Sequence, residues 1–219
     1  MRKRRILFGD YNTAVHGWTL TGWTFSAAEE KTNFKDKVGG DGSWDLSTAL
    51  TDGIPRYKDR KLTATFECSE GTRMGREAVI KHMINRLDGM REDIYLPDDI
   101  DHHINGKIHV ARGYNDLVHA AVTVTAICGP WKHANLEKVM TLTATETPQT
   151  VRLINEGRRV VVPTLKVEGT VNMEYDDTTV EITAGEYQWP KLQLTPGHHF
   201  LTYSGAGQIV ISYREAVLE

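Results

Sequence analysis

Carboxylates and histidines crowd into one short segment, where side chains of these types could hold a divalent metal ion. The residues concerned are Asp98, Asp99, Asp101, His102 and His103. Because the two histidines are adjacent, a strand would point them to opposite faces, and they could not share one ion. They also precede Asn105-Gly106, a dipeptide that favours a two-residue turn. We therefore expect a solvated hairpin near residues 100–112 and no metal site.

The other candidates for chemistry are isolated residues or partial motifs. Cys68 and Cys128 form no CxxC pair, and nothing in the spacing singles out a histidine partner for either thiol. Each ends an alternating apolar run, which favours a buried free thiol, although a bridge between neighbouring strands stays open. Gly205-Ala206-Gly207 has strands on both sides and no helix after it, which indicates a turn rather than a phosphate-binding loop.

Aromatic and acidic residues give little support for sugar chemistry. A carboxylate pair for glycoside hydrolysis is defined only in three dimensions, and no acidic residue lies in an aromatic-rich segment typical of a sugar cleft. Trp18 and Trp23 could line a ligand groove, but burial in a sheet is favoured for both. We therefore expect no enzyme activity, no catalytic residue and no cofactor.

Composition excludes little but sets the scale. The 219 residues are 40% hydrophobic and 25% charged, with a formal net charge of −3, as is ordinary for a soluble globular protein of one or two domains. We interpret the basic run Arg2–Arg5 as a solvated face, with a salt-sensitive contact to an acidic partner or nucleic acid as the alternative. The apolar stretch after it is too short for a secretory signal, and no window approaches a membrane helix. The protein should stay where it is made unless it leaves inside a larger particle.

The elements of the first half are predicted mainly from a period of two. Apolar residues alternate with threonine over residues 62–68 and again over 122–128, as half-buried strands require. One amphipathic helix is predicted over about 73–88, with Gly89 ending it. Its apolar face should cover one side of the sheet, with Arg76 on the opposite face.

The second half is predicted to consist of short strands separated by turns. From Val151 onward, apolar runs alternate with turn residues such as Glu168-Gly169 and Pro196-Gly197, a pattern typical of a β-sandwich. We divide the chain into a β-domain over 1–130, a linker over 131–149 and a β-sandwich over 150–219.

Two segments of the chain resemble the siphophage distal tail protein (Dit) family. The first reads Val38-Gly39-Gly40-Asp41-Gly42-Ser43-Trp44-Asp45-Leu46-Ser47 and continues through Tyr57-Lys58-Asp59-Arg60 into a long alternating strand. The second is the closing segment, Gly205 to Ala216, with its Tyr213-Arg214-Glu215 ending. The opening Asp10-Tyr11-Asn12-Thr13, the predicted helix and the Cys128-Gly129-Pro130-Trp131 junction follow in the family's order. Gly39 departs from the pattern, because proline is common there.

The resemblance implies a mainly β protein with one helix: an N-terminal tail-tube-like β-domain that forms rings, plus a C-terminal galectin-like β-sandwich. Members of the family form a hexameric ring through which the genome passes, bound on one side to the tail tube protein. On the other side they hold the tail-associated fibre or lysin protein and receptor-binding proteins. The implied location is the virion tail tip, after synthesis in the bacterial cytoplasm, with no membrane contact. No large insertion of the kind that adds sugar-binding modules is present.

Candidate interface residues come from the matching motifs and from the predicted hairpin. They are Gly40, Asp41, Gly42, Asp45, Leu46, Arg60, Asn105, Gly106, Tyr213 and Arg214. A channel that carries DNA should have few cations, so we expect Arg2–Arg5 to face away from it. The alternative function is a carbohydrate-binding β-sandwich, with Tyr175, Tyr187 and Trp189 as its aromatic candidates.

Overall fold

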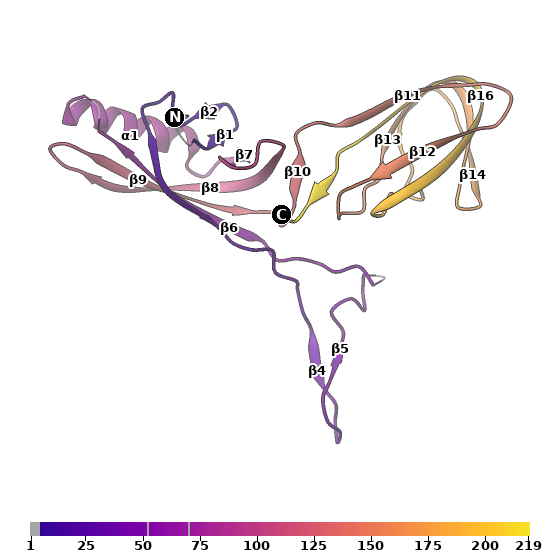
Figure 1. The fold of residues 1–219 in the computed structure, drawn as a ribbon, viewed down its shortest axis with the longest axis horizontal. Helices are drawn as coiled ribbons and strands as arrows, with labels where there is room; N and C mark the ends of the chain where they lie inside the picture. The colour runs from indigo at the N-terminus through magenta and orange to yellow at the C-terminus, as the bar shows by residue number, and fades with distance from the viewer. Residues whose placement is uncertain (1–4, 52, 70) are drawn as a thin grey trace. The chain divides into compact units, whose positions relative to one another are not determined.

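The computed structural model describes residues 5–51, 53–69 and 71–219, which divide into two compact units. The first unit comprises Met1–Lys132 with Glu219, and the second comprises His133–Leu218. The described chain is mostly antiparallel sheet with one helix (Figure 1), which confirms the expected fold class at this level. No helix of the described residues is long and apolar enough to cross a membrane.

An antiparallel sheet with the strand order β2-β1-β7-β8-β9-β6-β3 forms the centre of the first unit. Its strands are β1 (Leu7–Phe8), β2 (Tyr11–Asn12), β3 (Thr19–Phe25), β6 (Arg60–Cys68), β7 (Arg91–Tyr95), β8 (His102–Asn115) and β9 (Ala120–Cys128). On β6, every second residue from Arg60 to Cys68 is buried. The predicted alternation over 62–68 therefore does place one face of this strand in the core.

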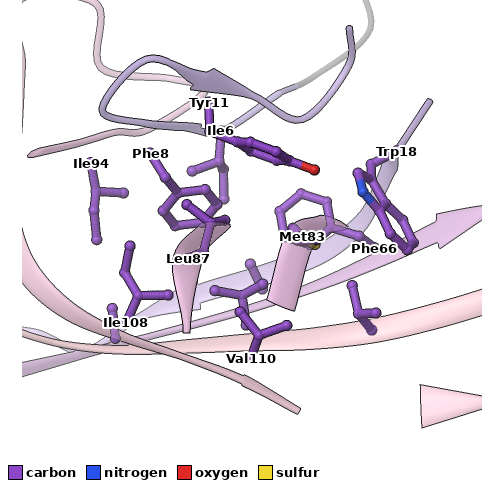
Figure 2. Close-up of a cluster of buried hydrophobic side chains, with 14 of the residues drawn as sticks. Ile6, Phe8, Tyr11, Trp18, Phe66, Met83, Leu87, Ile94, Ile108 and Val110 are labelled. Carbon is purple, nitrogen blue, oxygen red and sulfur yellow. The ribbon is translucent and has the colours of Figure 1, made fainter. Parts of the chain in front are cut away.

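The predicted helix is present as α1 (Arg73–Leu87) and covers one face of this sheet. Thr72 caps the start of the helix, because its Oγ1 accepts a hydrogen bond from the Gly75 amide at 3.1 Å. Just after its end, Gly89 has a φ of 79°, a conformation that glycine adopts at little cost. Figure 2 shows Met83 and Leu87 packed beside Phe8 and Phe66 in the buried cluster.

The expectation that Arg76 lies on the exposed face of the helix is wrong. Its side chain is buried, and the guanidinium donates to the carbonyl oxygens of Gly71 at 2.8 Å and Asp116 at 2.9 Å. A long charged side chain can be buried when carbonyl oxygens take up its hydrogens. Arg76 thus joins the start of α1 to the turn between β8 and β9.

The predicted hairpin over 100–112 is also wrong, because Asn105 and Gly106 lie inside the continuous strand β8. Gly106 pairs with Glu92 on one side and Cys128 on the other. A Cβ at this position would lie 2.6 Å from the Cys128 Sγ and 3.3 Å from the Ile127 carbonyl oxygen. Glycine is therefore present for close packing between strands rather than for a turn.

A two-stranded arm, residues 26–59, extends the antiparallel pairing of β3 and β6. It contains β4 (Phe34–Asp36) and β5 (Ser43–Asp45), and backbone hydrogen bonds such as Lys31 N to Arg56 O at 2.7 Å continue the pairing toward its base. No described side chain of the arm is buried. We call the sheet and α1 of the first unit its body, to distinguish them from the arm.

The second unit is built from strands only, within the described residues. They are β10 (Lys132–Ala134), which begins at the last residue of the first unit, β11 (Lys138–Ala144), β12 (Gln149–Asn155), β13 (Thr164–Tyr175), β14 (Thr178–Ile182), β15 (Gly185–Gln188), β16 (Gly197–Tyr213) and β17 (Ala216–Val217). The expected linker over 131–149 is thus largely strand: β11 pairs with β16 from Lys138 to Ala144. Thr141 and Thr143 lie on the exposed side of a regular alternation in β11, and Met140 and Leu142 lie on its partly buried side.

Three glycines form a corner in this unit, where a turn at 205–207 had been expected. β13 and β16 pair without interruption through Gly169, Gly205 and Gly207. A Cβ on Gly207 or Gly169 would collide with the carbonyl oxygen of Glu168 or Ala206, respectively. Past this corner the neighbours change from β12 and β14 to β11 and β15, and side chains from both halves share one buried cluster. Long strands that bend at glycines can supply both layers of a sandwich.

Candidate assembly surface

The arm exposes apolar side chains that would normally be buried. Phe34 is 58% exposed, Trp44 61%, Leu50 98% and Val38 fully exposed. Lys37 lies over the Trp44 ring at 5.2 Å, which covers little of it. A two-stranded hairpin without a sheet or helix against it is marginally stable in water. The arm is therefore the part of the first unit that most clearly lacks a packing partner.

The motif residues of the first segment all fall on this arm or at its base. Gly40, Asp41 and Gly42 form the tip between β4 and β5, and Gly42 has a φ of 78°. Asp45 accepts a hydrogen bond from the Ser47 amide at 2.9 Å, which fixes the chain as it leaves β5. Leu46 is exposed next to it. The sequence motif therefore specifies the turn geometry of the arm.

Arg60 holds the base of the arm to the body. Its side chain is buried, its Nε donates to the Ser26 carbonyl oxygen at 2.7 Å, and its Cζ lies 3.8 Å from the Phe25 ring centroid. Burial lowers the pKa of Arg60 from its usual value, but an arginine stays charged at neutral pH. The same residue borders an open cavity of about 390 Å³ that Trp23 and Phe25 also line. Trp18 is buried as expected, whereas Trp23 is only partly buried.

The edge strand β3 offers a second surface in the first unit. It pairs with β6 on one side and ends the strand order on the other. An edge strand of this length presents backbone donors and acceptors to another chain. A register shift between Leu20 and Gly22 interrupts its pairing with β6, an irregularity that often lies at sheet edges.

The sheet face opposite α1 carries threonines at its centre. Thr63 pairs with Thr125, and Thr65 pairs with Thr123. Lys61 and Lys107 flank Ile127 at one end of this face. These four threonines are polar and uncharged, and His109 on β8 lies beside Thr125, with its Nδ1 2.8 Å from Asp88 Oδ1.

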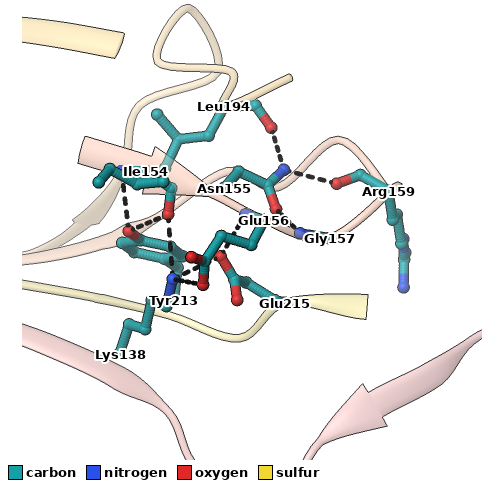
Figure 3. A network of polar contacts seen from close by, with 9 residues as sticks. All are labelled: Lys138, Ile154, Asn155, Glu156, Gly157, Arg159, Leu194, Tyr213 and Glu215. Carbon is teal, nitrogen blue, oxygen red and sulfur yellow. Dashed lines mark hydrogen bonds and ion pairs between the residues drawn. The ribbon is translucent and has the colours of Figure 1, made fainter. Parts of the chain in front are cut away.

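The closing motif, Tyr213-Arg214-Glu215, makes most of its contacts within the second unit. Tyr213 is buried, and its hydroxyl donates to the Ile154 carbonyl oxygen at 2.7 Å (Figure 3). Glu215 accepts from Lys138 Nζ at 2.8 Å and from the Glu156 amide at 2.7 Å. Arg214 between them is exposed. The Tyr-Arg-Glu ending thus fastens the chain near residues 154–156, and only Arg214 is open to a partner.

Asn105 and Gly106, the remaining candidates, lie within the body. The Asn105 side chain donates to Asp93 Oδ1 at 2.9 Å and accepts from Arg91 Nη1 at 3.1 Å, across neighbouring strands. The contacts of Asn105 and the close packing at Gly106 therefore serve the sheet itself.

In the acidic and histidine-rich segment 98–103, Asp99 forms contacts within the first unit. Asp99 accepts from Lys132 Nζ at 2.8 Å and lies 2.9 Å from His102 Nδ1. Burial alone would raise the pKa of Asp99, but these two partners outweigh it and hold the pKa below its usual value. Among the described residues, no group of three or more potential ligands is placed to hold a metal ion.

Both cysteines are free and buried, as expected. Burial raises the pKa of the Cys128 thiol to about 11. The reactive thiolate is therefore scarce at neutral pH.

The aromatic candidates for sugar binding do not gather on an exposed face. Tyr175 is buried and Trp189 packs against the core of the second unit. Tyr187 is exposed, but its hydroxyl lies over Ala184 and Gly185. A sugar usually stacks on an accessible ring, and these three residues do not form such a surface.

Comparison with known proteins gives one informative result. No family model matches the sequence, and no curated protein does. Among solved structures, the chain is similar to the SPP1 Dit (gp 19.1) protein, with a TM-score of 0.69 and 15% sequence identity over 96% of this chain and 98% of that one. That protein is described as a paradigm of the hub adsorption apparatus in phages that infect Gram-positive bacteria. The resemblance to distal tail proteins that the sequence motifs predicted is thus confirmed at the level of the fold, over nearly the whole chain.

Proposed function

We propose that this protein is a structural, non-enzymatic component of a phage tail tip. It would form a ring, hexameric as the family resemblance implies, between the tail tube and the host-recognition apparatus. The similarity of the fold to that of the SPP1 Dit protein, a hub component, supports a place in the tail tip. The observation that carries the proposal is the exposed apolar arm, because its side chains need a second surface to cover them.

The covering surface, in this proposal, belongs to the next copy of the chain. A head-to-tail contact uses two different surfaces on each copy and closes a ring when the rotation allows it. The arm supplies apolar side chains, and the edge strand β3 supplies unpaired backbone groups. Both lie in the first unit, where the sequence motifs had indicated the ring contact.

The threonine-rich face of the sheet is the proposed wall of the channel. A genome must pass without being held, and cations would bind its phosphates. The two threonine pairs add no charge to this face, and His109, which borders Thr125, has the carboxylate of Asp88 beside it. Helix α1 covers the opposite face. Arg5 is exposed; Arg2–Arg4 lie outside the described residues, so their direction stays a prediction.

The second unit is proposed to be the galectin-like sandwich that faces the tail-associated fibre or lysin protein and receptor-binding proteins. Its bent strands β13 and β16 support a two-layered sandwich. The first unit would contact the tail tube protein. The mature location would be the virion.

Mass measurement by light scattering tests the ring. We expect the full chain to reach the mass of six copies at high concentration. Changing Phe34, Val38 and Trp44 together to serine should abolish this species, because the apolar contact is lost, while the far-ultraviolet circular dichroism of the chain stays unchanged. Negative-stain micrographs of the wild type should show rings with a central hole.

The matched control changes three apolar residues away from the arm that are also well exposed. These are Val15, Leu117 and Leu136, each changed to serine. We expect this variant to keep the ring. A hexamer that survives loss of the arm side chains would contradict the role of the arm, and a chain that stays monomeric at every concentration would contradict spontaneous ring formation.

A further inference from the structure

One outward-facing surface of the second unit consists of polar side chains around a single exposed aromatic ring. It is formed by β12, by residues 197–204 of β16, by residues 170–175 of β13 and by β14, which are paired in that order. Along these strands every second side chain is buried or partly buried, so the side chains between them point away from the core. We call this surface the Phe200 face.

Phe200 supplies the ring, and 63% of this residue is exposed. Arg152 on β12 lies directly opposite it in the register of the two strands. Thr150 and Glu174 are paired with Thr202, two residues along β16, and so lie diagonally to the ring on either side. Opposite side chains of paired strands are about 5 Å apart at their Cβ atoms, and diagonal ones are about 7–8 Å apart. Hydrogen-bonding groups therefore surround the ring within the reach of one small ligand.

The polar groups beside the ring are both donors and acceptors. The guanidinium of Arg152 is held by His198, with Nη2 3.0 Å from each imidazole nitrogen and Nε 3.3 Å from Nδ1. These contacts use only part of its five N–H donors. The hydroxyls of Thr150 and Thr202 lie 3.2 Å apart, and the exposed carboxylate of Glu174 can only accept.

The composition of this face selects the class of ligand. A protein partner would require an apolar centre of several side chains, but among the described residues this face has one exposed large apolar side chain, Phe200. An anionic ligand such as nucleic acid would require an excess of cations, whereas Arg152 is accompanied by two exposed glutamates, Glu174 and Glu181. The face suits a neutral molecule that has one apolar side and many hydroxyl groups.

We propose that the Phe200 face binds a neutral oligosaccharide. The C–H side of one sugar ring stacks on Phe200, Arg152 donates to its hydroxyl oxygens, and Glu174 accepts from its hydroxyl hydrogens. The site uses none of the three aromatic residues that the sequence had suggested for sugar binding. It depends on the fold of the second unit and not on ring assembly, so failure of one proposal leaves the other standing.

Saturation-transfer NMR on the full chain tests the site, because irradiation of aromatic protons passes signal first to a ligand that lies against a ring. The probes are four neutral disaccharides: maltose, cellobiose, lactose and diacetylchitobiose. We expect at least one of them to receive the signal from the wild type. Phe200→Ala should weaken its binding about tenfold, the effect of leaving one apolar ring face in water. Absence of transfer to all four disaccharides would overturn the proposal.

Two further variants separate stacking from a general effect of substitution. Phe200→Trp keeps an aromatic surface and should retain binding. Val139→Ala removes an apolar side chain that is 60% exposed on β11, outside the Phe200 face, and should leave binding unchanged. Because both positions are exposed, these variants should keep the urea midpoint of the wild type.

Arg152→Met removes the donors but keeps a long side chain. It should weaken binding of the same disaccharide about fivefold, the scale of one lost hydrogen bond. Binding that is undiminished in Phe200→Ala would contradict stacking on this ring. Tighter binding of sulfated lactose than of lactose itself would contradict the neutral class of ligand.

Discussion

The body and the arm of the first unit are continuous in their strand pairing but opposite in their packing. On β6 the side chains of Leu62, Ala64 and Phe66 are fully buried, in one cluster with buried side chains of α1. On the arm, the apolar side chains of Phe34, Val38 and Trp44 face solvent. Backbone hydrogen bonds alone therefore do not distinguish the two regions; what differs is whether a second layer covers the strands.

This difference indicates what each region is built to do. Burial of apolar surface is the main source of folding free energy, so the body can be stable within one chain. The arm gains little from its own chain, and its sequence retains apolar residues that solubility would disfavour. Such a segment is best explained by a surface that another molecule covers.

The largest expected difference in stability comes from replacing a phenylalanine by alanine in each region. Phe66→Ala should destabilise the body by about 3–5 kcal/mol, because it leaves a cavity in a closed core. Phe34→Ala should change the stability of the monomer by about 0.5 kcal/mol or less, because that ring is already in water. Urea unfolding monitored by tryptophan fluorescence measures both. Equal effects of the two substitutions would show that the arm packs against its own chain.

A smaller contrast comes from adding a methyl group to a glycine in each region. Gly106→Ala should cost about 1–3 kcal/mol, because the new Cβ would press against Cys128 and the Ile127 carbonyl. Gly40→Ala, whose Cβ would meet only the Lys37 Cβ at 3.8 Å, should be tolerated within about 0.5 kcal/mol. Urea midpoints again provide the measurement. Tolerance of alanine at Gly106 would argue against close packing of β8 on β9.

The smallest contrast concerns charge and depends on pH. Asp99→Asn should cost about 1 kcal/mol near neutral pH, because charge-assisted bonds to Lys132 and His102 are weakened. The depressed pKa of Asp99 means that its carboxylate stabilises the folded chain above the unfolded pKa, near pH 4, and loses this effect as the pH falls through the folded pKa. The difference from wild type should therefore shrink as the pH falls below the unfolded pKa and vanish below the folded pKa.

The control for this prediction lies on the arm. The hydrogen bonds from Ser47 hold the pKa of Asp45 below its usual value, yet the residue is fully exposed. Asp45→Asn should leave the urea midpoint unchanged at either pH, because solvent screens its contacts. A pH-dependent change at Asp45 would mean that the arm contributes to the stability of the monomer.

The glycine positions show where sequence patterns mislead. Asn105-Gly106 and Gly205-Ala206-Gly207 have the composition of turns, yet both lie inside long strands. Composition cannot separate a glycine needed for its dihedral angles from one needed because a neighbouring strand leaves no room for a Cβ. Gly42 at the arm tip is the first kind, and Gly106 is the second.

The sequence by itself determined the strands over 62–68 and 122–128, the helix with its end near Gly89, the burial of both cysteines and the mainly β class, because local periodicity fixes which side chains share a face. Only the tertiary structure decided that Arg76 is buried, that β8 and β16 run unbroken, and that 138–144 is a strand. Each of these depends on atoms distant in the chain: the carbonyls that receive the guanidinium, the strands that crowd the glycines and the strand that pairs with β11. The arm depends on both. The sequence motif specified the turn at its tip, but only the tertiary structure showed that its apolar side chains are not packed against the rest of the chain.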